Sequence, residues 1–193
     1  MSSIIEHVRT TNETDIRARL ALYGNGTATV QTGIGFFDHM LEAVARHAWI
    51  DLEIDCQGDL EVDAHHTVED VGIVIGTMLG EAIYPVRNLE RYGNATVVMD
   101  EAAMRCDLDL SRRNYLAFEM PIGGRVGTFD VELAEEFFRA LSANAPLTLH
   151  MTYERGRNKH HILEAAFKAF AVALRRAVTP NERAGIPSTK GVL

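Results

Sequence analysis

Apolar and polar residues alternate along several short stretches of the chain, which is the pattern of strands that bury one face. Other stretches repeat their apolar residues every three or four positions, as helices that cover a core do. The segment Tyr23-Gly24-Asn25-Gly26 is typical of a hairpin turn between the first two strands. The first part of the chain therefore predicts strands at 16–22 and 27–31, a helix at 36–47, a strand at 50–56 and a helix at 65–83.

The second part of the chain repeats this order of elements. It predicts strands at 95–99, 103–110 and 115–120, a helix at 131–143, a strand at 147–153 and a helix at 155–178. A repeated order of this kind indicates an internal duplication. We therefore expect an α+β fold of two half-domains, residues 1–88 and 89–193, joined near 84–91. Together they would form one compact domain in which helices cover one face of each sheet.

A histidine doublet lies near the start of the last helix of each half, and a glutamate follows its first histidine by four residues. These groups are His65-His66 with Glu69 and His160-His161 with Glu164. On a helix, residues four apart share a face, whereas neighbours are turned by about 100°. Each doublet could therefore supply ligands to two different ions. The alternative is that these histidines are solvated or cap the helices, but the repetition of the pattern favours a two-metal centre.

Two further histidines could complete the metal centre. His39 lies on the first predicted helix, and His150 lies on a predicted strand, on the side opposite Leu149 and Met151. With the six donors of the two doublets they give eight ligands, or four for each of two ions. Imidazole and carboxylate ligands without thiolate suit Mn, Fe or Zn.

The composition limits the partners of the protein. A chain of 193 residues with a net charge of −8 lacks the basic surface of a general nucleic-acid binder. The sequence has neither an apolar signal segment nor a stretch long enough to span a membrane. Cys56 and Cys106 lie in alternating apolar stretches, as core residues do, and nothing indicates a disulfide framework. We therefore expect a cytoplasmic protein that binds no nucleic acid and no membrane.

Long ungapped motifs across nearly the whole chain resemble those of imidazoleglycerol-phosphate dehydratase, a lyase of histidine biosynthesis, in its monofunctional form. The motifs are TNETDI at 11–16, TGIGFFDHML at 32–41, DAHHTVEDVG at 63–72, RYGNA at 91–95, MDEA at 99–102, DLS at 109–111, NKHHILEAAFKA at 158–169 and PSTKGVL at 187–193. The resemblance implies two Mn²⁺ ions per subunit and a homo-oligomeric shell of 24 subunits with active sites between subunits.

The resemblance also implies a role for individual residues. One ion would bind His39, His66, His160 and Glu164, and the other would bind His65, Glu69, His150 and His161. All of these ligands except His150 would also contact the substrate, together with Glu13, His47, Arg91, Arg113, Lys168, Ser188 and Lys190. The phosphate would be held by Arg91, Arg113, Ser188 and Lys190. The family usually has Gly-Arg-Pro after DLS, where this chain has Arg112-Arg113-Asn114.

The implied reaction converts imidazoleglycerol phosphate to imidazoleacetol phosphate and water. The C–H bond that breaks has no neighbouring carbonyl, so the imidazole ring must act as the electron sink, and two metal ions would stabilise it as the imidazolate. Glu13 is the candidate acid and base, with a metal-bound water as the alternative. Two other classes use similar ligands. A binuclear hydrolase would activate a hydroxide, and a metal-storage protein would present the same side chains on a helical bundle, which the predicted strands argue against.

Overall fold

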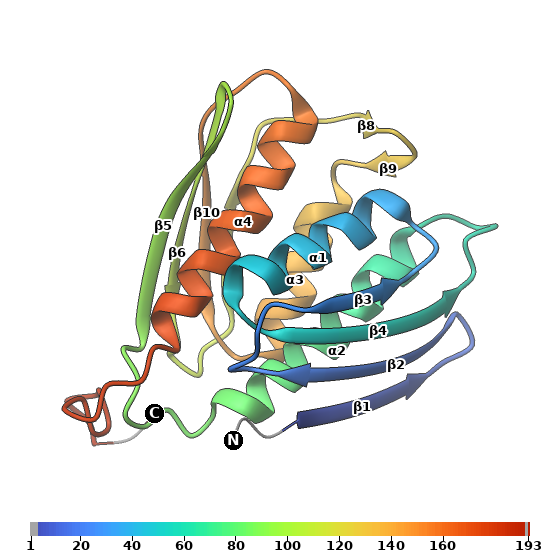
Figure 1. Cartoon of the computed structure of the whole chain (residues 1–193). Helices are drawn as coiled ribbons and strands as arrows, with labels where there is room; N and C mark the ends of the chain where they lie inside the picture. Colours follow the sequence, from blue (N-terminus) through green and yellow to red (C-terminus); the bar gives the residue numbers. More distant parts are fainter. Residues whose placement is uncertain (1–3, 192) are drawn as a thin grey trace.

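Two sheets form the outer layers of the structure, and helices lie between them (Figure 1). The computed structural model describes residues 4–191 and 193. Within this range there are two four-stranded sheets and four helices, with one small two-stranded sheet at the edge. Each large sheet turns its apolar side chains to the helices: Ile16 and Leu20 are buried, whereas Arg17 and Arg19 between them are exposed. The α+β class and the cover of helices on one face are therefore confirmed.

The first half begins with an outer hairpin of two antiparallel strands, β1 (Ile4–Thr10) and β2 (Thr14–Ala21). The chain then forms β3 (Ala28–Gln31), α1 (Gly35–Ala48), β4 (Asp51–Gly58) and α2 (His65–Ile83). The strand order in the sheet is β1-β2-β4-β3, with β4 antiparallel to β2 and parallel to β3. α2 therefore starts at the end of β4, which places the first histidine doublet at one edge of this half.

The second half follows the same plan. Its elements are β5 (Tyr92–Met99), β6 (Ala102–Asp109), β7 (Tyr115–Glu119), β8 (Arg125–Val126), β9 (Phe129–Asp130), α3 (Leu133–Asn144), β10 (Thr148–Arg155) and α4 (Lys159–Ala177). The strand order β5-β6-β10-β7 and the strand directions match those of the first half. This agreement supports the predicted duplication, while a boundary between residues 88 and 89 stays a prediction.

The structure corrects the prediction in three places. The turn at Tyr23–Gly26 does not close a hairpin, because β4 lies between β2 and β3. Asp51 at the start of β4 accepts hydrogen bonds from the backbone of Asn25 and Thr27, and these bonds hold the turn against β4. The sequence reading also missed β1 and the short pair β8–β9. β1 is an edge strand whose residues alternate only between half-buried and exposed, so its apolar pattern is weak.

The two halves are joined by helix packing. α2 packs against α3, and α1 packs against α4. α2 carries glycines at 72 and 76 on its contact face, where a Cβ would lie 2.8 Å from the carbonyl oxygen of Phe137 and 2.5 Å from that of Leu141. Glycine therefore allows the backbones of α2 and α3 to approach closely.

A cluster of fully buried aromatic rings fills the space between the helices: Phe37, Phe137, Phe138, Phe167 and Phe170. Phe37 of α1 and Phe167 of α4 both contact Phe137 of α3, so α3 fixes the positions of α1 and α4 relative to each other. No helix among the described residues is both long and apolar enough to cross a membrane.

Candidate metal centre

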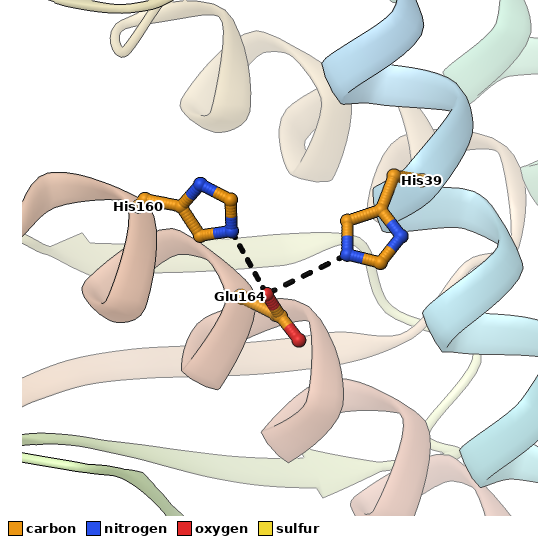
Figure 2. Close-up of side chains that lie close together, drawn as sticks. All are labelled: His39, His160 and Glu164. Atoms are coloured by element: carbon orange, nitrogen blue, oxygen red, sulfur yellow. Dashed lines mark hydrogen bonds and ion pairs between the residues drawn. The ribbon is translucent and has the colours of Figure 1, made fainter.

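Three of the predicted ligands meet where α1 crosses α4 (Figure 2). His160 and Glu164 lie four residues apart on α4, and the Nε2 atom of His160 is 3.0 Å from Oε2 of Glu164. His39 extends from α1, and its Nε2 atom is 3.6 Å from the same oxygen. The three donor atoms lie within 4.8 Å of one another. Two imidazole nitrogens and a carboxylate oxygen at this spacing fit one divalent ion of the Mn, Fe or Zn type.

The carboxylate of Glu164 is held in its charged form. Its side chain is only 8% exposed, and its second oxygen accepts a hydrogen bond from Lys168 Nζ at 2.6 Å. Burial would raise the pKa of this carboxyl, but the hydrogen bond and charge of Lys168 and the contacts with His160 and His39 outweigh it and lower the pKa. Glu164 is therefore an anion in a largely buried place, which is what a cation site requires.

A pocket of about 530 Å³ opens beside these three residues. His39 and Glu164 line it together with two predicted substrate contacts, His47 and Lys168. Burial and the nearby charges of Lys168 and Arg175 lower the pKa of His47. The lowered pKa favours the neutral form of the His47 imidazole, which can accept a proton.

The first doublet lies apart from this pocket, at the start of α2. His65 faces Glu69 with 3.9 Å between Nε2 and Oε2. The ring of His66 points the other way: its Nδ1 atom is 2.9 Å from Oδ2 of Asp59, and its Nε2 atom is 3.6 Å from Oε1 of Glu13. The hydrogen bond with Asp59 raises the pKa of His66. The expected divergence of the two histidines is confirmed, and Glu13 lies beside a predicted metal ligand.

The second doublet is arranged in a similar way. While His160 turns to Glu164, the Nδ1 atom of His161 is 2.8 Å from Oε2 of Glu101, and this contact raises the pKa of His161. Glu101 also accepts the backbone N–H groups of Arg157 and Asn158. These backbone bonds, that of Asn158 first, and the contact with His161 lower the pKa of Glu101 to about 2. Glu101 is thus ionised throughout the physiological range.

His150 faces away from all of these groups. It is exposed on β10 between Leu149 and Met151, which are fully buried, so it lies on the outer face of its sheet as expected. Its nearest ring is Tyr115, at 5.7 Å between centroids. Among residues 4–191 and 193, His39, His160 and Glu164 are the one group of three candidate ligands within coordinating distance. Within one chain, therefore, neither predicted set of four metal ligands lies close together.

The four predicted phosphate ligands line a second pocket, of about 600 Å³. They are Arg91, Arg113, Ser188 and Lys190. Asp109 organises the two arginines: it binds Nε and Nη2 of Arg91 at 2.8 and 3.2 Å, and it lies 3.7 Å from Nη2 of Arg113. The side chain of Arg91 is 11% exposed and that of Arg113 is 68% exposed. Arg91 is therefore fixed, whereas Arg113 can move toward an anion.

The turn after DLS contains a residue with a left-handed backbone conformation. Arg112, where the family has glycine, adopts a positive φ of 56°, a conformation that costs a non-glycine residue about 1–2 kcal/mol. Its backbone N–H donates to the Tyr84 hydroxyl at 3.2 Å. Arg113 thus still borders the predicted anion pocket.

Sequence reasoning missed four carboxylates that contact the side chains of predicted site residues. These are Asp59, Asp100, Glu101 and Asp109. Each stands in or next to a turn and has no distinctive spacing from the residue that it contacts. Asp100, Glu101 and Asp109 do fall in the motifs MDEA and DLS, and that position was the available signal.

Comparison with known proteins identifies the family of this chain. The imidazoleglycerol-phosphate dehydratase family profile matches residues 32–174. A protein of that name from Sulfurovum is 68% identical over 190 residues, covering 98% of this chain and 100% of its own length. The one from Wolinella succinogenes is 63% identical over 188 residues, covering 97% and 99%.

Two crystal structures of imidazoleglycerol-phosphate dehydratases have the same fold. The enzyme of Staphylococcus aureus superposes with a TM-score of 0.85 at 41% identity, covering 93% of this chain and 100% of that one. The enzyme of Pyrococcus furiosus gives 0.85 at 37% identity, covering 97% and 100%. The chain therefore belongs to the imidazoleglycerol-phosphate dehydratase family, hydro-lyases of histidine biosynthesis.

Proposed function

We propose that this chain removes water from imidazoleglycerol phosphate with the help of two Mn²⁺ ions per subunit. The observation that carries the proposal is the meeting of His39, His160 and Glu164 beside a pocket that also contains His47 and Lys168. His66 would complete the first set of ligands. The second set would be His65, Glu69, His150 and His161, so that each ion takes one histidine from each doublet.

The placement of these ligands supports active sites between subunits. His150 lies on the outer face of its sheet, and the two doublets begin helices in different halves. A neighbouring chain could bring its own ligands to the exposed His39 and to the half-buried His65 and Glu69. We propose a closed homo-oligomer of 24 subunits in which the ions bind at such contacts. The free, buried thiols of Cys56 and Cys106 suit a reducing compartment, so we propose the cytoplasm as its location.

Different residues of the chain would serve different steps of the reaction. When bound, the two cations would make the substrate's imidazole ring a better electron acceptor, since positive charge on the ring nitrogens favours its anionic form. Loss of the hydroxyl group next to the ring and of a proton from the neighbouring carbon gives an enol, which becomes the ketone. We assign the proton transfers to Glu13, whose carboxylate lies 3.6 Å from Nε2 of His66.

The second pocket would hold the phosphate end of the substrate. Arg91, held by Asp109 and by the carbonyl of Pro187 at 2.6 Å, offers a fixed guanidinium. Arg113 and Lys190 add mobile charges, and Ser188 adds a hydroxyl. Charge-assisted hydrogen bonds of this kind are the usual means of phosphate recognition.

The test is an assay of the purified protein with imidazoleglycerol phosphate and Mn²⁺, in which the ketone product is measured together with the number of ions per chain. Two ions and a ketone product are expected. Glu69→Ala and Glu164→Ala should each lose one ion, whereas Glu42→Ala, an exposed carboxylate at the edge of the same pocket as Glu164, should keep both. Fully metallated protein without product would sink the dehydratase assignment, and one ion or none under Mn²⁺-replete conditions would contradict the two-metal site.

A further inference from the structure

The second histidine of each doublet makes the same contact with a carboxylate. His66 presents Nδ1 to Asp59 at 2.9 Å, and His161 presents Nδ1 to Glu101 at 2.8 Å. The two carboxylates do not occupy matching positions in the repeat. Asp59 follows β4, whereas Glu101 lies in the turn between β5 and β6. Glu101 directly precedes β6, as Glu13 directly precedes β2, but Glu13 lies 3.6 Å from Nε2 of His66 and not at Nδ1. The carboxylate at Nδ1 therefore comes from a different segment in each half.

Other side chains accept the backbone N–H groups of His65 and His160 at the starts of the two helices. The backbone N–H of His65 at the start of α2 donates to Asp63 at 2.7 Å, and that of His160 at the start of α4 donates to the side chain of Asn158 at 3.0 Å. Asp59 places both of its oxygens within 3.2 Å of Nδ1 of His66, and Glu101 uses one oxygen on the ring of His161 and the other on backbone N–H groups. Their contact with the rings thus calls for an explanation other than helix capping.

We propose that Asp59 and Glu101 are positioning residues of the metal centre, each holding a histidine ring so that its Nε2 atom is directed at an ion. An ionised carboxylate can only accept, so the neutral ring must carry its proton on Nδ1 and keep the lone pair on Nε2. The same bond fixes the rotation of the ring. Carboxylates behind metal-binding histidines act in this way and also make the imidazole a stronger ligand.

The directions of the two rings agree with this role. The Nε2 atom of His66 lies 3.6 Å from Oε1 of Glu13, and that of His161 lies 3.8 Å from Asp100 and 3.4 Å from the side-chain amide of Asn158. Both Nε2 atoms therefore face partly open, acidic surroundings that suit a cation. This inference rests on the proposed metal function and adds two residues to it.

Glu101→Gln gives a sharp test because the structure fixes which way the amide must point. One oxygen of Glu101 accepts the backbone N–H groups of Arg157 and Asn158, so the amide oxygen of glutamine would take that place. Its NH₂ group would then donate to Nδ1 of His161 and force the proton to Nε2. The variant keeps shape and hydrogen bonds but offers the wrong nitrogen to the ion, a change that is costly in other histidine–carboxylate pairs.

The measurements are Mn²⁺ affinity, by competition with a chelator, and the tautomer of the metal-free rings, by solid-state ¹⁵N NMR of histidine-labelled protein. Glu101→Gln and Asp59→Ala should bind Mn²⁺ about 10–100-fold more weakly at one site, and Glu101→Gln should show His161 protonated on Nε2. Glu61→Ala is the matched control, because it removes an equal charge from an exposed side chain in the turn that follows Asp59. Thermal unfolding confirms that each variant is folded.

The outcomes separate this inference from the function on which it rests. If the parent protein binds two ions and both variants bind them equally well, Asp59 and Glu101 have no positioning role. An equal loss in Glu61→Ala would reduce the effect to general charge and overturn the proposal as well. If the parent protein itself binds no Mn²⁺, the proposed metal centre fails first, and the positioning role fails with it.

Discussion

Asp109 shows how a single residue can prepare a binding pocket. It neutralises and fixes Arg91 while leaving the exposed side chain of Arg113 only loosely attached, at 3.7 Å. An anion that enters the pocket can therefore draw Arg113 away at little cost, because an exposed ion pair contributes little to stability. Arg91 supplies the fixed geometry, and Arg113 supplies the adjustable charge.

Arg113→Ala and Lys190→Ala should weaken substrate binding and leave metal binding unchanged. A charge-assisted hydrogen bond contributes roughly 1.5–3 kcal/mol, so KM should rise by about tenfold to a hundredfold for each variant. Steady-state kinetics with the Mn²⁺-loaded protein measures this. Arg112→Ala is the matched control, because its guanidinium lies over the Tyr84 ring and outside the pocket lining. A normal KM in Arg113→Ala would remove that residue from the phosphate site.

The packing of α2 against α3 depends on small residues in α2. Gly76→Ala should destabilise the protein, because its Cβ would lie 2.5 Å from a backbone oxygen of α3. Overpacking of this kind costs about 1–3 kcal/mol and outweighs the gain in helix propensity of about 1 kcal/mol.

The glycines of α2 form a graded series that can be compared by chemical denaturation. At Gly72 the nearest backbone oxygen would be 2.8 Å from the new Cβ, and at Gly80 it would be 3.2 Å away. The loss of stability on substitution by alanine should therefore fall in the order Gly76, Gly72, Gly80. Equal stability of all three variants would mean that the backbones of α2 and α3 do not meet as closely as described.

The turn between β2 and β3 should make a contribution to stability that depends on pH. Asp51 accepts bonds from the backbone N–H groups of Thr27 and Asn25 and from the Thr27 hydroxyl, and the bonds from Thr27 lower the pKa of Asp51. A carboxyl with a lower pKa in the folded state stabilises that state above its unfolded pKa of about 3.9. This contribution is lost as the pH falls through the lower, folded pKa.

Asp51→Asn should therefore be less stable than the parent at pH 6, and the difference should shrink as the pH falls below about 4. Urea unfolding at several pH values and one protein concentration measures this. Asp55→Asn, which changes an exposed carboxylate on the same strand, should show no such trend. If the difference stays constant down to pH 3, Asp51 stabilises the turn through its hydrogen bonds and not through its charge, and the prediction is wrong.

The helices and strands were largely predictable from the sequence, whereas the pairing of the strands was not. α2 was predicted with the bounds that it has, since a long apolar helix is marked by its period over many residues. The same local pattern carries no information on which strands pair. The turn of Tyr23–Gly26 has hairpin chemistry, yet β4 enters between the strands because its apolar face fits the core beside β2.

At the scale of the whole molecule, metal and assembly should be coupled. If each ion takes ligands from more than one chain, Mn²⁺ binds the assembled state in preference to the free subunit and shifts the equilibrium toward it. Chelation should therefore give smaller species, and added Mn²⁺ should restore the shell. Light scattering at neutral pH, with the metal content measured in parallel, follows both steps. An unchanged mass after confirmed loss of metal would show that protein contacts alone hold the assembly.

The candidate site shows why the geometry of the metal centre could not be predicted from the sequence of one chain. The doublets indicated the ligands because helical spacing is local, and the divergent rings of His65 and His66 follow from it. Within one chain, however, these ligands lie in separate clusters, and His150 faces outward. Residues that act from turns, such as Asp59 and Glu101, are recognised only when the fold brings them to a ring.

The helix contacts between the halves have one more consequence. α1 corresponds to α3 and α2 to α4 in the repeat, so the contacts of α2 with α3 and of α1 with α4 exchange with each other when the halves are exchanged. This is the isologous symmetry of a homodimer. A half made as a separate chain would find the same surface on a second copy, and its folding would depend on concentration. The peptide link between α2 and β5 holds the halves at a fixed effective concentration, so that a dimer interface becomes the core of one chain.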